Sequence, residues 1–349
     1  MSAVDDIKKL VAKFKRGISD VVGLDVSETE IAAARIRKNN DGSLVLTAAD
    51  ILPAPRMTPA TADAPANVAP CQVPQKLKAR YASLAMTGDS AIIKLLTFPG
   101  AFDENADGNK VIENIGVDKP DNYRISFKLI SAGHAKAESR VLAVAVPEPE
   151  AQACVMLLPS GIPAPHSLEI SALSAITAFL RVGGERHRND AVGIVEFGRN
   201  TTTFSILNKN TLVLIRRFPA GTAAVMNKIQ ESLGVDQETA QGIVSDGSFD
   251  ISQSINDIMD PVIKQMIVSR DFVERRENCQ MTKLYISGGL TVSRDLVEEM
   301  KTSLSVEVST WSPFEGLTVP EGAVADVYKG QEWRFAAAVG ACLATFEET

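Results

Sequence analysis

Apolar residues in this chain recur in three segments as short runs, each closed by small and polar residues. The first run, at 21–26, gives way to Ser27-Glu28-Thr29 and is followed by a second apolar stretch. A similar alternation spans 191–207, and a third apolar run ends in Gly288-Gly289. This pattern predicts two β-hairpins with tight turns, and later in the chain a strand that ends in a glycine pair.

The two predicted hairpin turns carry residues suited to phosphate and metal binding. An acid stands near the end of each opening strand, Asp25 in the first hairpin and Glu196 in the second, and hydroxyl residues follow. Backbone N–H groups and hydroxyls in such a turn form a concave site for phosphates, and a neighbouring carboxylate can hold hydrated Mg²⁺. One such turn alone would be a weak signal, and unrelated strand-turn units of an α/β protein are the alternative.

The remaining hydrophobic periodicity predicts an α/β chain. Alternating or continuous apolar runs predict strands at 43–52, 90–98, 123–130, 141–146, 211–218 and 306–309. Helical spacing predicts helices at 77–84, 111–115, 149–158, 168–182, 222–233, 236–244, 251–274, 296–304 and 333–346. The last of these is rich in alanine and contains Gly340, and such small residues allow a helix to pack closely against its neighbour.

Two segments lack this periodicity. Six prolines stand in residues 53–74 among Ala, Thr and Asp, with almost no large apolar side chain, so the segment cannot bury enough surface to fold alone. We predict an extended linker or a mobile excursion there. Residues 103–109 mix acids with turn residues but lack the closing Glu of a calcium-binding loop, so we predict a solvated turn.

Composition narrows the class of protein. The 349 residues exceed what one hydrophobic core usually serves, so two or more subdomains are expected. The 43 acidic residues outnumber the 36 basic ones, which argues against a nucleic-acid partner. The four cysteines and three histidines show no metal-ligand spacing. Neither a signal peptide nor an apolar run of membrane-spanning length is evident, so the sequence predicts a cytoplasmic protein.

Residues 1–18 predict a short basic amphipathic helix. Apolar residues recur there at helical spacing, and five lysines and arginines lie on the other faces. Two interpretations stay open. The helix packs on its own domain or frays, or it attaches to an acidic membrane surface or to a partner.

The order of the three strand-turn units resembles the PilM family of actin-like type IV pilus assembly proteins, which is related to the cell-division protein FtsA. The residues that carry the resemblance are Gly23-Leu24-Asp25-Val26-Ser27, Glu196-Phe197-Gly198-Arg199-Asn200-Thr201-Thr202-Thr203, Pro219-Ala220-Gly221 and Ile286-Ser287-Gly288-Gly289-Leu290, with the segments at 141–146 and 163–179. The likeness covers residues 20–346 in order. It implies an actin-like ATPase fold: two duplicated ribonuclease H-like α/β domains, an inserted small α/β subdomain and a helical subdomain.

We expect the domains to follow the plan of that family. The predicted units are a basic N-terminal helix (1–18), a first actin-like domain (19–52 and 166–189), a Pro-rich linker (53–74), an inserted α/β subdomain (75–165), a second actin-like domain (190–218 and 280–332), a helical subdomain (219–279) and a closing helix (333–349). This order, with the insert where actin has another subdomain, is more specific than any single motif.

The resemblance also implies a site for ATP and Mg²⁺. The residues that it places at the nucleotide are Asp25, Ser27, Glu28, Thr29, Glu196, Gly198, Arg199, Asn200, Thr201, Gly221, Lys228, Gly288 and Gly289, with Asp25 and Glu196 as the metal ligands. The chain departs from the family pattern at Val26-Ser27, where Gly is usual, and at Glu196, which replaces Asp. Each lost phosphate contact costs about 1.5–3 kcal/mol. We therefore expect weak or absent ATPase activity and assign no catalytic residue.

The leading functional hypothesis is a scaffold of a type IV pilus, or a related secretion, assembly platform at the inner membrane. The resemblance implies a groove between the first domain and the insert, which binds the cytoplasmic N-terminal segment of a single-pass, PilN-like membrane protein. A second copy of the chain is another candidate partner. The alternatives are an active ATPase or small-molecule kinase of the same superfamily, and an FtsA-like cell-division protein. We find neither the general-base Asp of a sugar kinase nor the basic C-terminal helix of a division protein.

Overall fold

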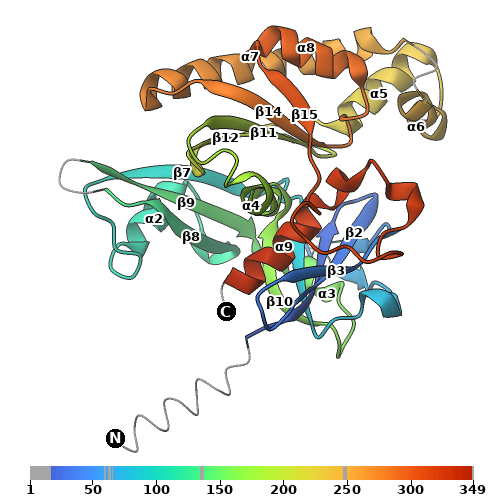
Figure 1. Ribbon diagram of the computed structural model, residues 1–349, viewed down its shortest axis with the longest axis horizontal. Coiled ribbons are helices and arrows are strands. Elements are labelled where there is room, and N and C mark those ends of the chain that lie inside the picture. Colours follow the sequence, from blue (N-terminus) through green and yellow to red (C-terminus); the bar gives the residue numbers. More distant parts are fainter. Residues whose placement is uncertain are drawn as a thin grey trace, which may run out of the picture.

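The computed structural model shows two five-stranded β-sheets, with two helices between them and smaller units attached (Figure 1). It describes residues 17–58, 60–61, 64, 66–133, 137–246 and 250–347. The amphipathic helix predicted at 1–18 therefore lies almost entirely outside the described residues. In the described part of the chain, no helix combines the length and the apolar character that crossing a bilayer requires.

The first sheet is built around a mostly apolar central strand. Its members are β1 (Asp20–Val26), β2 (Glu30–Lys38), β3 (Leu44–Pro53), β6 (Tyr81–Met86) and β10 (Ala164–Ile170), in the spatial order β10-β6-β1-β2-β3. Strand β1 pairs antiparallel with β2 and parallel with β6. A central strand is covered on both faces, which explains its apolar run at 21–24. The first predicted hairpin is confirmed.

The second sheet repeats the pairing pattern of the first. Its members are β11 (Ala191–Phe197), β12 (Thr202–Asn208), β13 (Thr211–Phe218), β14 (Met281–Gly288) and β15 (Glu307–Thr310), in the order β13-β12-β11-β14-β15. Here β11 takes the place of β1, because it pairs antiparallel with the next strand and parallel with β14. Two sheets with one topology confirm the predicted duplicated, actin-like architecture.

Helices α4 (Ser171–Gly183) and α9 (Ala336–Glu347) fill the space between the sheets. They pack on one another, and α9 also lies against β1, β2 and β6. Glycines make this contact possible: a Cβ at Gly340 would collide with the carbonyl oxygen of Ser174, and one at Gly23 would collide with that of Ala338. One hydrophobic core, with Phe179 and Phe335 fully or almost fully buried in it, draws residues from both sheets.

Each sheet carries an additional unit. The insert on the first sheet consists of β7 (Ile92–Pro99), α2 (Gly108–Ile115), β8 (Tyr123–Ser131) and β9 (Glu138–Pro147), with its strands in the order β7-β9-β8. Helix α3 (Glu148–Met156) follows and contributes to the core of the first sheet. Helices α5 (Thr222–Leu233), α6 (Gln237–Asp246), α7 (Ser252–Glu277) and α8 (Arg294–Leu304) cover the second sheet. We call the first sheet with α3 the first lobe, and the second sheet with α5 to α8 the second lobe.

An ion pair joins the insert directly to the second lobe. The Arg140 guanidinium on β9 donates to both carboxylate oxygens of Glu277, the last residue of α7, at 2.6 and 3.2 Å. The two side chains are only 17% and 13% exposed. Bidentate pairs of this kind are among the stronger polar contacts in proteins.

Three predicted segments differ in the structure. The helix predicted at 77–84 is wrong, because these residues enter strand β6, where burial on both faces overrides the helical preference of Ala, Leu and Met. The helix predicted at 168–182 begins only at Ser171, after strand β10. Within the Pro-rich segment, β4 (Arg56–Thr58) and β5 (Asn67–Ala69) form a small antiparallel pair that packs on the first lobe. We propose that the insert starts after β6 rather than at residue 75.

The contact between α9 and α4 makes a direct prediction for two helical glycines. Gly340→Ala should lower the free energy of unfolding by about 1–3 kcal/mol, because the new methyl group must push the helices apart. Gly242→Ala is the matched control: this glycine is also helical, but its Cβ would meet no atom within 4 Å, so the change should stabilise by about 0.5–1 kcal/mol. Urea denaturation measures both, and equal effects at the two positions would contradict the proposed contact.

Candidate functional site

The turns of the two predicted hairpins meet in space. The β1–β2 turn lies beside the β11–β12 turn, and the Arg199 Nε–H donates to Glu28 Oε2 at 2.7 Å. The loop that follows β6 joins them, since Asn200 Nδ2 donates to Asp89 Oδ2 at 2.8 Å. Segments from both lobes thus meet in one group of polar side chains, and we call this region between the turns the cleft. The structure brings the phosphate-type turns together as their pattern suggested.

Asp25 and Glu196 form the acidic floor of this cleft. Burial raises the pKa of the Asp25 carboxyl to about 6, although the Ser171 hydroxyl, which donates to Asp25 Oδ1 at 2.5 Å, opposes the change. Burial, followed by the charge of Asp25, raises the pKa of Glu196 to about 8, and Arg217 opposes this. Two neighbouring carboxylates that disfavour each other's ionised form are a donor pair that Mg²⁺ accepts together with water molecules.

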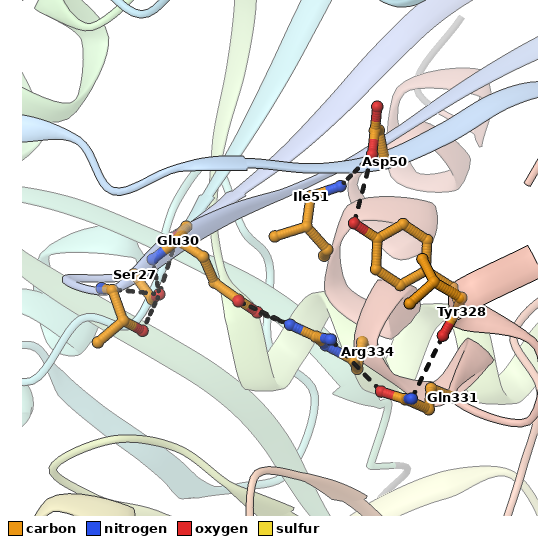
Figure 2. Close-up of polar contacts among 9 residues, drawn as sticks. Ser27, Glu30, Asp50, Ile51, Tyr328, Gln331 and Arg334 are labelled. Carbon is orange, nitrogen blue, oxygen red and sulfur yellow. Dashed lines mark hydrogen bonds and ion pairs between the residues drawn. The ribbon is translucent and has the colours of Figure 1, made fainter. Parts of the chain in front are cut away.

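The first turn is fixed largely by its own hydrogen bonds. The Ser27 hydroxyl donates to the Glu30 carbonyl at 2.8 Å and accepts from the backbone N–H groups of Glu30 and Thr29 at 3.2 and 3.4 Å. Thr29 Oγ1 lies 3.3 Å from the same hydroxyl. Figure 2 shows the residue that follows the turn, Glu30, whose two carboxylate oxygens accept from Arg334 Nη2 at 2.6 and 2.8 Å. Ser27 therefore shapes the turn rather than pointing a free hydroxyl into the cleft.

The network around Arg334 ties this turn to the segment that leads into α9. The Arg334 guanidinium also donates to Gln331 at 3.4 Å and lies over the ring of Tyr328. Tyr328 in turn donates to Asp50 on β3 at 3.4 Å (Figure 2). The position of the first turn is thus coupled to that of helix α9.

The second turn is braced by the start of α5. Gly198 N donates to the Thr201 carbonyl at 3.0 Å and closes the turn. The first two N–H groups of α5, from Thr222 and Ala223, donate at 3.0 and 2.9 Å to the carbonyls of Gly198 and Arg199. A Cβ at Gly221 would meet these same two carbonyl groups. Gly221 thus permits the helix terminus to back directly onto the turn.

The remaining predicted residues occupy supporting positions. Gly288 has a φ of 92° and its Cβ would collide with the backbone of Phe197, while a Cβ at Gly289 would meet Thr222. The Lys228 Nζ on α5 pairs with Asp257 on α7 at 3.0 Å. The glycines therefore gather under the second turn, whereas Lys228 is engaged within the helical part of the second lobe. Their contact with a nucleoside stays a prediction.

Sequence reasoning missed two residues of the cleft, Asp89 and Arg217. Arg217, near the end of β13, donates to the carbonyls of Gly88 and Ala91 at 2.7 and 3.1 Å and lies 3.6 Å from Asp89. The signal was Thr87-Gly88-Asp89, a turn sequence directly after an apolar run. It was overlooked because that run was assigned to a helix.

A second candidate site is a groove of about 760 Å³ between the insert and the interlobe helix α4. Alternate residues of β9, namely Leu142, Val144 and Val146, line one wall. Leu173, Thr177 and other residues of α4 line the opposite wall. The wall on β9 is apolar, but charged residues such as Glu104 and Lys128 also line the groove, and residues 207 and 210–212 of the second lobe close one side of it.

The backbone of β8 also lines this groove. Residues 126–130 all border it, whereas β9 contributes only every second residue. Strand β8 stands at the edge of its sheet, so the N–H and C=O groups of every second residue point away from β9. One of these, the Leu129 N–H, donates to Glu104 Oε1 at 2.6 Å. An edge strand beside an apolar wall is a surface onto which an extended peptide can add.

The comparison with protein families agrees with this architecture. The model of the family described as "Type IV pilus assembly protein PilM" matches residues 23–346. The chain belongs to the PilM family. This match covers most of the chain and includes both hairpins, the insert and α9. No curated protein sequence matches the chain.

Solved structures show the fold of the PilM family at low sequence identity. A chain of a PilM-PilN type IV pilus biogenesis complex superposes with a TM-score of 0.76 at 16% identity, and the match covers 93% of this chain and 98% of that one. MreB 5 of Spiroplasma citri, bound to AMPPNP, gives 0.47 at 9% identity over 95% and 97% of the two chains. The archaeal actin homolog Ta0583 gives 0.46 at 12% over 95% and 100%. We draw no functional argument from these last two scores.

The raised pKa values of the acidic floor predict an unusual pH dependence. Burial raises the pKa of both carboxyls above their usual range, so the native state binds more protons and its stability should fall as pH rises from about 4 to 8. Glu196→Gln should therefore stabilise the protein by about 1–3 kcal/mol at pH 8 and by much less at pH 5. Urea denaturation in EDTA at both pH values measures this. The exposed control Glu321→Gln should change stability equally at pH 5 and pH 8. If Glu196→Gln also gave the same change in stability at both pH values, the prediction would be wrong.

Proposed function

We propose that this protein is an actin-like scaffold of a type IV pilus, or related secretion, assembly platform at the inner membrane. In this proposal the groove between the insert and α4 binds the cytoplasmic N-terminal segment of a single-pass, PilN-like membrane protein. Membership of the PilM family supports the pilus role, and the solved relative is itself a PilM-PilN complex. The observation that carries the proposal is the groove with its apolar wall on β9 and the edge strand β8 along one side.

The geometry of the groove suggests how such a segment binds. An extended segment beside β8 would form backbone hydrogen bonds with alternate residues of that strand and direct every second side chain toward α4. The seven residues 124–130 are long enough for a strand of about 23 Å. Leu142 and Val144 would contact apolar side chains of the segment, and the exposed Lys128 favours an acidic group nearby. In this geometry the partner segment is held by several backbone hydrogen bonds rather than by one side chain.

ATP and Mg²⁺ are the second part of the proposed function, and we place them in the cleft. The Asp25 and Glu196 carboxylates are suited to hold Mg²⁺, and Arg199, Asn200 and Thr201 carry donors suited to phosphate oxygens. Bound there, magnesium-ATP would supply a charged bridge between the two hairpin turns. Ser171 would keep Asp25 oriented, and its hydroxyl already donates to that carboxylate. An active ATPase is the second candidate function, and the paired carboxylates are the observation in its favour.

The groove predicts that one substitution strongly weakens partner binding. Thr177→Arg on α4 places a long charged side chain in the groove and should weaken binding by more than about tenfold, that is by more than about 1.4 kcal/mol. The probe is the synthetic cytoplasmic N-terminal segment of the PilN-like protein of the same organism, labelled for fluorescence anisotropy. Val268→Arg, at a position 56% exposed on α7 and outside the groove, is the matched control and should bind like the wild type.

A backbone scan of the same peptide tests the strand geometry. Methylation of single peptide nitrogens should weaken binding at every second position, because only alternate N–H groups of an added strand face β8. If the unmodified peptide fails to bind at high micromolar concentration, the proposed function is wrong. If the peptide binds but methylation does not weaken binding at alternate positions, the peptide is held by its side chains and does not add to β8 as a strand.

A further inference from the structure

The two hairpin turns are held together by side chains of opposite charge. Glu28, in the first turn, accepts from the Arg199 Nε–H at 2.7 Å and from the Asn200 amide at 3.4 Å. These partners come from different lobes. The Glu28 side chain is 62% exposed and that of Arg199 30%, so the contact spans the mouth of the cleft rather than its floor.

A second acid of the first lobe binds the same turn. Asp89 accepts from the Asn200 amide at 2.8 Å and from the Thr201 hydroxyl at 3.3 Å. Its carboxylate also lies 3.6 Å from Arg217. Arg199, Asn200 and Thr201, the residues of the second turn suited to phosphate, therefore each have a carboxylate partner within the chain.

Carboxylate and phosphate oxygens compete for the same donors. Both are anionic acceptors that bind a guanidinium or an amide N–H with similar geometry. We propose that Glu28 and Asp89 are built-in competitors of nucleotide phosphate, which occupy the donors of the second turn until a nucleotide displaces them. The inference rests on the proposed nucleotide cleft and is independent of the peptide groove. In this proposal nucleotide affinity depends on Asp89 and on Glu28, and Glu28 competes with the nucleotide instead of binding it as the family resemblance implied.

The competing explanation is an ordinary surface ion pair. Such pairs stabilise proteins little and would leave ligand affinity unchanged when removed. Glu30 separates the two explanations, because it is an acid of the same hairpin that pairs with Arg334 and not with Arg199 (Figure 2). Neutralising either acid removes one negative charge, and Glu30 is the acid whose charge acts on the Asp25 carboxyl, so Glu30→Gln measures the effect of charge alone. Only the loss of Glu28 frees donors of the second turn.

The experiment is a calorimetric titration with magnesium-ATP at fixed ionic strength. Glu28→Gln should bind about tenfold more tightly than the wild type, and Glu28→Gln with Asp89→Asn more tightly still. Glu30→Gln should change affinity by no more than about threefold, the allowance for a general charge effect. Adding Arg199→Gln to Glu28→Gln should remove the gain, because the donor that Glu28 released is then missing.

Hydrogen exchange supplies a readout that does not require ligand. In Glu28→Gln the backbone amides of residues 198–201 should exchange faster than in the wild type, and magnesium-ATP should slow them again. Equal ATP affinities for Glu28→Gln and wild type, an equal gain in Glu30→Gln, or no binding by any variant would each overturn the inference. Peptide binding measured on the same samples shows whether the variants are folded and tests the proposed scaffold separately.

Discussion

The close approach of α9 to β1 and α4 is the contact on which the rest of the structure depends. Gly23 and Gly340 remove the side chains that would keep these backbones apart, and the alanines of α9 do the same along its length. The two sheets therefore share one core instead of forming two separate ones. With the lobes joined so tightly at this layer, the turns at the ends of β1 and β11 are placed opposite one another.

Helix α4 belongs to both candidate sites. Its first residue, Ser171, donates to Asp25 in the cleft, while Leu173 and Thr177, within its first two turns, line the groove. The sites nevertheless differ in character. The donors of the second turn in the cleft already have carboxylate partners within the chain, whereas the groove has an apolar wall on β9 and is bordered by the edge strand β8. The chain thus combines a site suited to small anions with one suited to an extended peptide.

Local patterns allowed most of the fold to be predicted. The two hairpins and the glycine-ended strand depend on the alternation of neighbouring residues, which a single sequence displays. Strand β6 was missed because Ala, Leu and Met favour helices, and only its burial between β1 and β10 makes it a strand. Asp89, which follows this strand, was not predicted as a site residue for the same reason. The pairing of Glu28 with Arg199 joins residues 171 positions apart, and no local pattern indicates such a contact. The acids in the turns were therefore predictable, but their partners were not.

The buried ion pair between Arg140 and Glu277 has a mechanical consequence. It fastens β9, one wall of the groove, to the end of α7 in the second lobe, while the opposite wall belongs to the interlobe helix α4. Because Leu207 and Leu212 of the second lobe also line the groove, a displacement of the second lobe relative to α4 would move these residues together with β9. The width of the groove would then depend on the angle between the lobes. A strand bound in the groove would restrict changes in this angle.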